Sequence, residues 1–420
     1  MMRTLTYCKL SGYRKAMKTL LSHLQLADVR VTSLHSSSVN FSKRLVLGIE
    51  TSCDDTGAGV VDEHGKILGD ALHSQLKIHT DYGGILLPRA QALHEEHIGP
   101  VVQKALTAAQ VTIQDVDAIA VTTMPGLALS LKVGLQYAKE LVQQTGKPMI
   151  PIHHMQAHAL TVRLLQKVDF PFLVFLLSGG HCLLAVVKDV DDFLLLGNSL
   201  DNSPGVCLDK IARELGLKRL PQCENLSGGA AIELLAKDGD PTSFSVPHML
   251  SFRRDCEFSF SGLITYFKRL IAKEKDRQGL SEDQVLPNVS DICAVCQYGL
   301  ARTLCQRLLR AFMYCELKGL LPERKILVAS GGVASNMYFR KCLTQVCDMF
   351  SCQLICPPPQ LCTDNGIMIA WNGMEKLLVG RGIAEDPMSI LYVAKSPIGT
   401  DIRDDVLNAN IKLPRFKLKT

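Results

Sequence analysis

Hydrophobic residues in this 420-residue chain first gather into short apolar runs that are closed by small polar residues. A run at residues 45–49 leads into Glu50-Thr-Ser-Cys-Asp-Asp-Thr56 and then into a second run at residues 58–61. The same arrangement returns at residues 172–189, where Ser178-Gly-Gly-His181 separates two apolar runs. Runs of this length bounded by turn residues predict β-strands. Two strand–turn–strand units about 125 residues apart therefore predict two related lobes.

Elsewhere, apolar residues recur at the spacing of an α-helix. The periodicity predicts helices over residues 93–109, 126–144, 205–216, 230–237, 258–275, 291–312 and 367–379, and apolar runs predict strands at 117–122 and 325–329. Strands that alternate with helices indicate an α/β fold. No apolar run reaches the length needed to cross a bilayer, so we expect no membrane span.

The first 44 residues differ in composition from the rest. They contain eight Lys or Arg residues, one acidic residue (Asp28), many Ser and Thr residues, and no long apolar block. Such a segment predicts a mitochondrial transit peptide, with a disordered basic arm as the alternative. Its removal would take the formal net charge from +5 to −2. The folded part is then not basic overall, and a nucleic-acid-binding surface must be a local patch.

The fifteen cysteines lack the spacing of a disulfide framework. In the reducing mitochondrial matrix we expect most of them to be free, buried thiols. Cys293 and Cys296 form a C-x-x-C pair, but this pair lies within a predicted helix and has no second pair nearby. Core packing is therefore the preferred interpretation over metal binding or redox chemistry.

His154 and His158 are four residues apart in Pro151-Ile-His-His-Met-Gln-Ala-His158. If this stretch is helical, the two imidazoles lie on one face and can share a cation such as zinc or iron. Helix-capping or core histidines are the alternative. A metalloprotease site would have Glu after the first His, but Met155 occupies that position, so a protease would lack its general base.

Asp364 is the candidate for a third ligand. It follows Pro357-Pro-Pro359 and precedes the predicted helix at residues 367–379, where an Asp usually serves as the helix N-cap. With His154 and His158 it would instead complete a set of two His and one carboxylate, which leaves positions open for a substrate oxygen.

Ser-Gly-Gly occurs three times, beginning at Ser178, Ser227 and Ser330. Glycine pairs let the backbone turn sharply and approach a ligand closely, and the neighbouring N–H groups and hydroxyls suit phosphate oxygens. The three copies predict a nucleotide held between the lobes. The sequence contains neither a P-loop nor a Rossmann fingerprint.

Seven motifs together resemble one known family. In order along the chain they are residues 49–56 (Ile-Glu-Thr-Ser-Cys-Asp-Asp-Thr), 153–158 (His-His-Met-Gln-Ala-His), 177–181 (Leu-Ser-Gly-Gly-His), 208–210 (Leu-Asp-Lys), 258–263 (Phe-Ser-Phe-Ser-Gly-Leu), 330–336 (Ser-Gly-Gly-Val-Ala-Ser-Asn) and 363–366 (Thr-Asp-Asn-Gly). They are similar to the tRNA adenosine threonylcarbamoyltransferases, formerly called O-sialoglycoprotein endopeptidases. The resemblance covers residues 45–395, and with the basic first segment it is greatest to the mitochondrial members.

The resemblance implies the actin/Hsp70/sugar-kinase-like fold, an α/β fold with a nucleotide cleft between duplicated lobes. We accordingly expect residues 1–44 to be the transit segment, residues 45–150 with about 371–395 to form the first lobe, residues 151–370 the second lobe, and residues 396–420 a C-terminal tail.

The activity implied is transfer of threonylcarbamoyl from threonylcarbamoyl-AMP to the exocyclic amine of the adenosine 3′ of the anticodon, in mitochondrial tRNAs that read codons beginning with A. His154, His158 and Asp364 resemble the ligands of one divalent zinc- or iron-type ion. The positions that resemble adenylate-binding ones are Leu177, Ser178, Gly179, Gly180, His181, Asp209, Gly229, Ser335 and Asn336. His181 is also a candidate general base, with loop packing as the alternative, and an Asp209–Lys210 surface pair is the alternative for Asp209.

The family also implies partners: mitochondrial tRNA, a separate threonylcarbamoyl-AMP synthase upstream, and a second copy of the chain in a homodimer. Basic candidates for tRNA contact are Arg89 and residues 253–254, 268–269, 273–277 and 415–419. Several family positions are altered, notably at Asp55, Gln156 and Ile264. The alternatives to the transferase are an ATPase or kinase of the same fold and a non-catalytic member of it.

Overall fold

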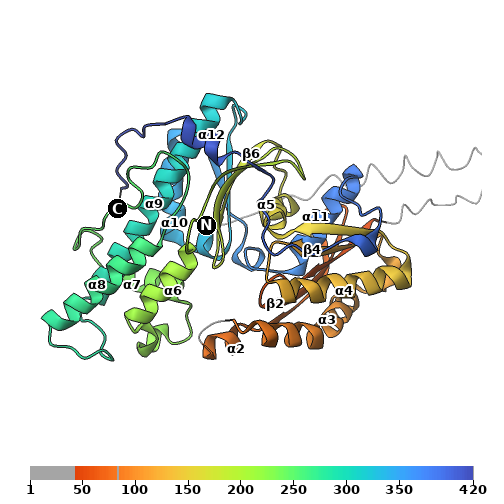
Figure 1. Cartoon of the computed structure of the whole chain (residues 1–420), viewed down its shortest axis with the longest axis horizontal. Coiled ribbons are helices and arrows are strands. Elements are labelled where there is room, and N and C mark those ends of the chain that lie inside the picture. The colour runs from red at the N-terminus through yellow and green to blue at the C-terminus, as the bar shows by residue number, and fades with distance from the viewer. Residues whose placement is uncertain (1–42, 83–84, 420) are drawn as a thin grey trace, which may run out of the picture. The chain divides into compact units, whose positions relative to one another are not determined.

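The computed structural model describes residues 43–82 and 85–419, apart from the side chains of residues 80 and 81. The predicted transit segment thus lies outside the described residues, except for its last two positions. Figure 1 shows the chain with its elements labelled.

The first sheet has five strands in the order β3-β2-β1-β4-β5. They are β1 (Leu45–Glu50), β2 (Asp55–Asp62), β3 (Ile67–Ser74), β4 (Ala118–Met124) and β5 (Met149–His153). β1 to β3 form an antiparallel meander, while β4 and β5 add to β1 in parallel. Every residue of β1 is buried, as expected for a strand covered on both faces of its sheet.

The second sheet repeats this topology. Its strands are β6 (Phe172–Leu177), β7 (Cys182–Val187), β8 (Phe193–Asn198), β9 (Ile326–Ser330), β10 (Gln353–Ile355) and the short β11 (Thr400–Asp401). From β8 through β7, β6 and β9 to β10, the order and strand directions match those from β3 to β5. The prediction of two related lobes is confirmed.

Helices cover both faces of the first sheet. α3 (Leu87–Ala109) and α4 (Ala128–Thr145) pack on one face through a core that includes Leu47 and Ile49. α11 (Gly366–Val379) packs on the other face, against the alternate residues of β1 and β4. The short α2 (Leu76–Asp81) precedes α3. Successive residues of β1 point to opposite faces of the sheet, so this strand contributes to two separate hydrophobic layers.

The second sheet is also covered on both faces. A large core joins Phe175 and its neighbours to α6 (Pro204–Glu214), α7 (Gly228–Ala236), α8 (Ser261–Arg277), α9 (Val289–Lys318) and α10 (Met337–Met349). The opposite face, with Val174 and Leu176, packs on α5 (His154–Leu165). α12 (Arg403–Asn408) follows β11.

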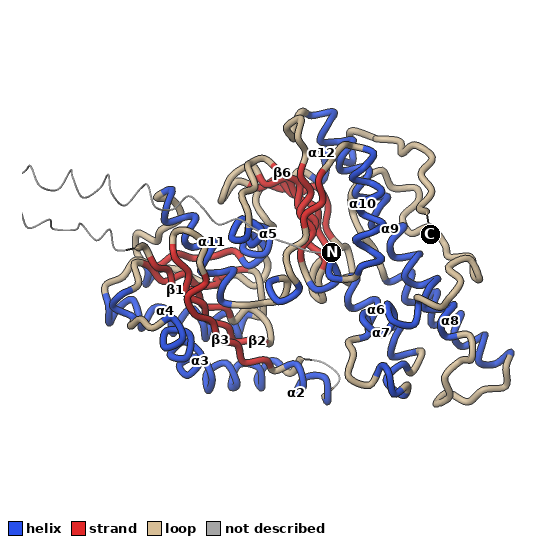
Figure 2. Tube along the Cα trace, turned by 180° about the vertical axis from the view of Figure 1, so that it is seen from behind, coloured by secondary structure: helices blue, strands red, loops and turns tan. Residues whose placement is uncertain are grey.

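Two helices cross between the lobes. α5 follows the last strand of the first sheet but packs on the second sheet, and α11 follows β10 of the second sheet but packs on the first. α5 and α11 also contact each other, and both lie between the sheets (Figure 2). This exchange brings the start of α5 close to the loop that precedes α11.

The predicted helices are all present, but several boundaries were wrong. α3 begins at Leu87 rather than at residue 93, because Pro88 in its first turn is compatible with a helix start. α8 begins at Ser261 rather than at residue 258, because Phe258 forms a β-bridge with Ser199. The Ser-Gly-Gly at Ser227 follows no strand; Ser227 caps α7 through a hydrogen bond from the Ala230 N–H group.

Two further expectations concern cysteines and membranes. Cys293 and Cys296 are buried in α9, so their assignment to core packing is confirmed, and the fourteen cysteines of the described residues are free thiols. In the part of the chain described here, no helix combines the length and the apolar character of a membrane span.

Candidate functional site

The two histidines lie at the start of α5. β5 ends at His153, whose ring accepts a hydrogen bond from the Met155 N–H group and so caps the helix. His154 and His158 are then one turn apart on a single face, as their spacing predicted. Their rings are nearly perpendicular, with centroids 4.7 Å apart, and both side chains are only 5% exposed.

Asp364 meets these histidines from the loop before α11. Its Oδ1 lies 3.0 Å from His158 Nε2 and 3.5 Å from His154 Nε2. The N-cap of α11 is the next residue, Asn365, whose side chain accepts a hydrogen bond from the Met368 N–H group. The helix-capping interpretation of Asp364 is therefore wrong, and its carboxylate is free to face the imidazoles.

One ligand atom from each of the three residues lies within 4.8 Å of the others. Two imidazole nitrogens and one carboxylate oxygen form a donor set that suits zinc or iron. The Asp364 side chain remains 25% exposed, so one side of the cluster is open to a substrate. The residues present therefore fit a divalent metal ion.

Glu50 supports the cluster and was absent from the predicted site residues. It ends β1, is fully buried, and places Oε2 3.1 Å from His154 Nδ1. Glu50 also accepts hydrogen bonds from the Ser52 N–H group at Oε1 and from the Thr122 hydroxyl at Oε2. A carboxylate that holds Nδ1–H directs the Nε2 lone pair toward a metal. The sequence signal was a charged residue ending an otherwise apolar strand.

The charges of the cluster depend on one another. Burial opposes ionisation of Asp364, but the charge and hydrogen bonds of His154 and the hydrogen bond of His158 outweigh it and hold the pKa of Asp364 well below its usual value. Burial likewise opposes protonation of His154, yet Asp364 and Glu50 raise its pKa well above the ordinary value. Burial of Glu50 is outweighed by His154, so the pKa of Glu50 is lowered. The carboxylates of Glu50 and Asp364 thus favour positive charge at His154, and a metal ion supplies such charge.

The loop after β6 lies beside this cluster. The Ser178 hydroxyl accepts hydrogen bonds from the Gly180 and His181 N–H groups, and the Ser178 N–H group donates to the His181 carbonyl. Of the backbone N–H groups of Ser178, Gly179 and Gly180, these bonds use those of Ser178 and Gly180, so that of Gly179 is left to face a phosphate. Apart from the chain neighbours of each glycine, no atom of the described residues lies within 4 Å of a Cβ placed on Gly179 or Gly180, so the loop is open on that side.

His181 links the loop to the histidine pair, because its ring centroid lies 6.2 Å from that of His154. Burial is the main cause that lowers the pKa of His181 to about 4, and the charge of His154 adds to it. The imidazole is therefore neutral near pH 7 and can accept a hydrogen bond or a proton, although its low pKa makes it a weak base.

The remaining predicted nucleotide positions surround this loop. α6 begins against it, since the Gly205 N–H group donates to the Ser178 carbonyl and the Ser203 hydroxyl donates to the Gly179 carbonyl. Asp209 lies farther along α6, beside the start of α7, where the backbone of Gly228 and Gly229 approaches its carboxylate.

The segment after β9 packs against the other side of the Ser178–His181 loop. Gly331, with a φ of 104°, packs directly against the Leu177 carbonyl and leads into the short 3-10 helix η4 (Gly332–Ser335). Ser335 is half-buried. The side chain of Asn336 caps α10 and donates to Gln297, so it contributes to the fold at this position.

The structure also shows where three of the altered family positions lie. Gln156, two residues after His154 in α5, is buried, and the Ile264 side chain of α8 is buried in the core. Asp55 begins β2, and burial raises the pKa of its carboxyl group to about 6. None of these three is a ligand atom donor in the cluster of His154, His158 and Asp364.

The repeated sheet and the exchanged helices α5 and α11 define the actin/Hsp70/sugar-kinase class of two-lobed proteins. Among solved structures, a ROK hexokinase from Thermus thermophilus is similar, with a TM-score of 0.42 and 16% identity over 78% of this chain and 98% of that one.

Comparison with protein families is more specific. The TsaD family model, described as tRNA N6-adenosine threonylcarbamoyltransferase, matches residues 66–371. The mitochondrial tRNA N6-adenosine threonylcarbamoyltransferase of Mus musculus is 52% identical over 93% of this chain and 94% of that protein. That of Homo sapiens is 52% identical over 90% of this chain and 92% of that protein. The chain belongs to the tRNA N6-adenosine threonylcarbamoyltransferase family.

Proposed function

We propose that this protein transfers threonylcarbamoyl from threonylcarbamoyl-AMP to the exocyclic amine of the adenosine 3′ of the anticodon, in mitochondrial tRNAs that read codons beginning with A. The observation that carries this proposal is the convergence of His154, His158 and Asp364 beside the Ser178–His181 loop, in a chain of this family. Its relatives are mitochondrial enzymes, and we assign the chain to the same compartment.

The reaction is an acyl transfer. The amine nitrogen attacks the carbamoyl carbon, the bond from that carbon to the phosphate oxygen of AMP breaks, and one amine proton leaves. His154, His158 and Asp364 would hold one divalent zinc- or iron-type ion, which supplies Lewis acidity and orients substrate oxygens. Because an aromatic amine is a weak nucleophile, positioning by the surrounding residues contributes much of the rate.

The chain's own groups then have separate tasks. The open Ser178–Gly180 loop receives the adenylate, and the Gly179 N–H group donates to its phosphate. Asp209 accepts hydrogen bonds from the ribose hydroxyls. Glu50 fixes the tautomer of His154, and neutral His181 accepts the proton or a hydrogen bond from the substrate.

Two partners belong to the same proposal. A separate synthase that makes threonylcarbamoyl-AMP acts upstream. We also propose that the chain acts as a homodimer. The comparisons do not favour an ATPase, a kinase or a non-catalytic role.

Transfer can be measured directly with purified protein, threonylcarbamoyl-AMP and an unmodified anticodon stem-loop. The wild-type chain should form the modified nucleoside, and His154→Ala should reduce the rate at least 100-fold. His64→Ala, which removes an exposed imidazole, serves as the matched control. Full activity of His154→Ala would remove the metal role from the proposal.

Metal analysis tests the ligand set independently of turnover. Wild-type protein and His64→Ala should retain about one ion per chain, whereas His158→Ala and Asp364→Ala should each lose it. Equal metal content in all four proteins would contradict the assignment of these ligands.

A further inference from the structure

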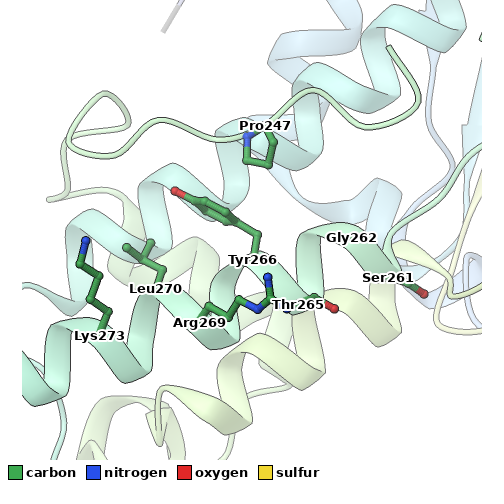
Figure 3. A pocket seen from close by; sticks show the side chains of 8 residues that line it. All are labelled: Pro247, Ser261, Gly262, Thr265, Tyr266, Arg269, Leu270 and Lys273. Carbon is green, nitrogen blue, oxygen red and sulfur yellow. The ribbon is translucent and has the colours of Figure 1, made fainter. Parts of the chain in front are cut away.

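A pocket of about 700 Å³ lies along α8, and its lining includes two of the basic residues named above as candidates for tRNA contact, Arg269 and Lys273. Its lining residues are Pro247, Ser261, Gly262, Thr265, Tyr266, Arg269, Leu270 and Lys273 (Figure 3). All but Pro247 belong to α8 and lie on one face of it, because they recur at intervals of three and four residues. The pocket therefore follows the helix for about three turns.

The lining is divided between hydrogen-bond donors and apolar groups. Ser261, Thr265, Arg269 and Lys273 are each four residues apart, so two hydroxyls and two cations follow one another about 6 Å apart along the axis. Tyr266, Leu270 and Pro247 supply an apolar side, and Figure 3 shows the Tyr266 ring beneath Pro247. The hydroxyl of Tyr266 donates to the Ser245 carbonyl, which fixes the ring.

Arg269 and Lys273 differ from the other cations of α8 in having neither an ion-pair nor a hydrogen-bond partner within the described residues; Lys275, for example, donates to the Glu282 carbonyl. Lys268 lies 3.7 Å from Glu214, and Arg277 pairs with Glu274 at 2.7 Å. Within the described residues, neither Arg269 nor Lys273 forms an ion pair or a side-chain hydrogen bond, and both side chains are exposed. Two unpaired positive charges in a pocket favour an anionic ligand.

The pocket is joined to the candidate site at one end. Asp201 accepts hydrogen bonds from the Ser259 hydroxyl and from the backbone N–H groups of Phe260 and Ser261. The next residue, Asn202, donates to the Ser261 hydroxyl. Ser203 follows and donates to the Gly179 carbonyl of the open loop. A polymeric ligand whose reacting unit lies at the Ser178–Gly180 loop can therefore continue along α8.

We propose that this pocket binds single-stranded RNA adjoining the adenosine that is modified, with phosphates at Arg269 and Lys273 and a base or ribose against Tyr266 and Leu270. The proposal rests on the proposed function. Donors repeated over about 18 Å suit a polymer of regularly spaced charges better than a single small anion. Unpaired RNA also offers bases that pack on aromatic side chains.

The test measures the binding of a fluorescent, unmodified anticodon stem-loop to the full-length protein at several salt concentrations. Arg269→Gln and Lys273→Gln should each raise Kd about fivefold at low salt and reduce the slope of log Kd against log salt by roughly 1. Lys104→Gln, on the exposed face of α3, is the matched control: it removes the same charge but does not line the pocket, and its Kd should stay within twofold.

Tyr266→Leu tests the apolar side separately. It keeps much of the apolar volume but removes the ring, so Kd should rise about tenfold while the salt slope is unchanged. Tyr266→Phe should restore most of the affinity. Unchanged thermal melting of the variants would show that these effects do not come from unfolding.

The outcomes separate this proposal from the transferase assignment. If wild-type protein binds the stem-loop through these residues but forms no modified nucleoside, the proposed function fails and the RNA pocket stands. If wild-type protein modifies the RNA while Arg269→Gln, Lys273→Gln and Tyr266→Leu leave Kd and the salt slope unchanged, the pocket proposal is overturned. Binding of an acidic protein segment in place of RNA would give this second result.

Discussion

At the scale of single residues, Glu50 decides how His154 can act. The carboxylate is buried and receives hydrogen bonds from Ser52 and Thr122, so its position is fixed before any ligand binds. Its contact with Nδ1 leaves Nε2 of His154 facing Asp364. A residue outside the ligand set thus orients one of the candidate metal ligands, which is a common arrangement in metal sites.

Glu50→Gln tests this role. The amide keeps the shape of the side chain but loses the charge that holds His154, so metal affinity should fall about 10- to 100-fold. The measurement is a competition titration with a chelating dye, with circular dichroism to confirm the fold. Glu140→Gln, on the exposed face of α4, is the control and should bind metal like the wild-type protein. Unaltered affinity in Glu50→Gln would contradict the positioning role.

At the scale of elements, the close contact between α11 and the first sheet places Asp364. Gly48 in the middle of β1 allows this contact, because a Cβ there would lie 2.2 Å from the Ala370 nitrogen and 2.3 Å from the Gly366 carbonyl oxygen. Both atoms belong to the backbone, so only movement of the helix would relieve the clash. The loop that carries Asp364 would move with it.

Gly48→Ala should therefore lower the free energy of unfolding by about 3 kcal/mol and weaken metal binding as well. Urea denaturation measures the first effect. Gly99→Ala is a matched control, since its Cβ would meet nothing nearer than the Tyr137 hydroxyl at 3.9 Å. Inside α3 the gain in helix propensity is opposed by the crowding of a Cβ that precedes Pro100, so this control should change the free energy of unfolding by no more than about 1 kcal/mol. Equal stability of Gly48→Ala and wild-type protein would show that α11 can shift without cost.

At the scale of the whole molecule, the metal ligands come from both halves of the chain. His154 and His158 lie on the helix that follows the first sheet, and Asp364 precedes the helix that follows β10 of the second. An ion held by all three would tie the exchanged helices together. Ligand binding to the native state stabilises it by about 2.7 kcal/mol at a free concentration 100 times Kd.

Zinc added to chelator-treated protein should accordingly raise the melting temperature of the wild-type chain and leave that of His158→Ala unchanged. Differential scanning fluorimetry at several zinc concentrations provides the measurement. The free thiols also bind zinc when the chain is unfolded, which reduces the shift. His158→Ala keeps all of these thiols, so the difference between the two proteins isolates the site. An equal shift in both would exclude stabilisation through His158.

The sequence by itself determined β1, β2, β4, β6, β7 and β9, most helices, the duplication and the pairing of His154 with His158, because these follow from hydrophobic periodicity and local spacing. It did not predict β3, β5, β8, β10 or β11. It did not determine that Asn365 caps α11 while Asp364 turns to the imidazoles, since both residue types favour helix starts. It also left Glu50 unassigned. Only the exchange of α5 and α11 between the sheets brings Glu50, His154, His158 and Asp364 together, and such long-range packing has no local sequence signal.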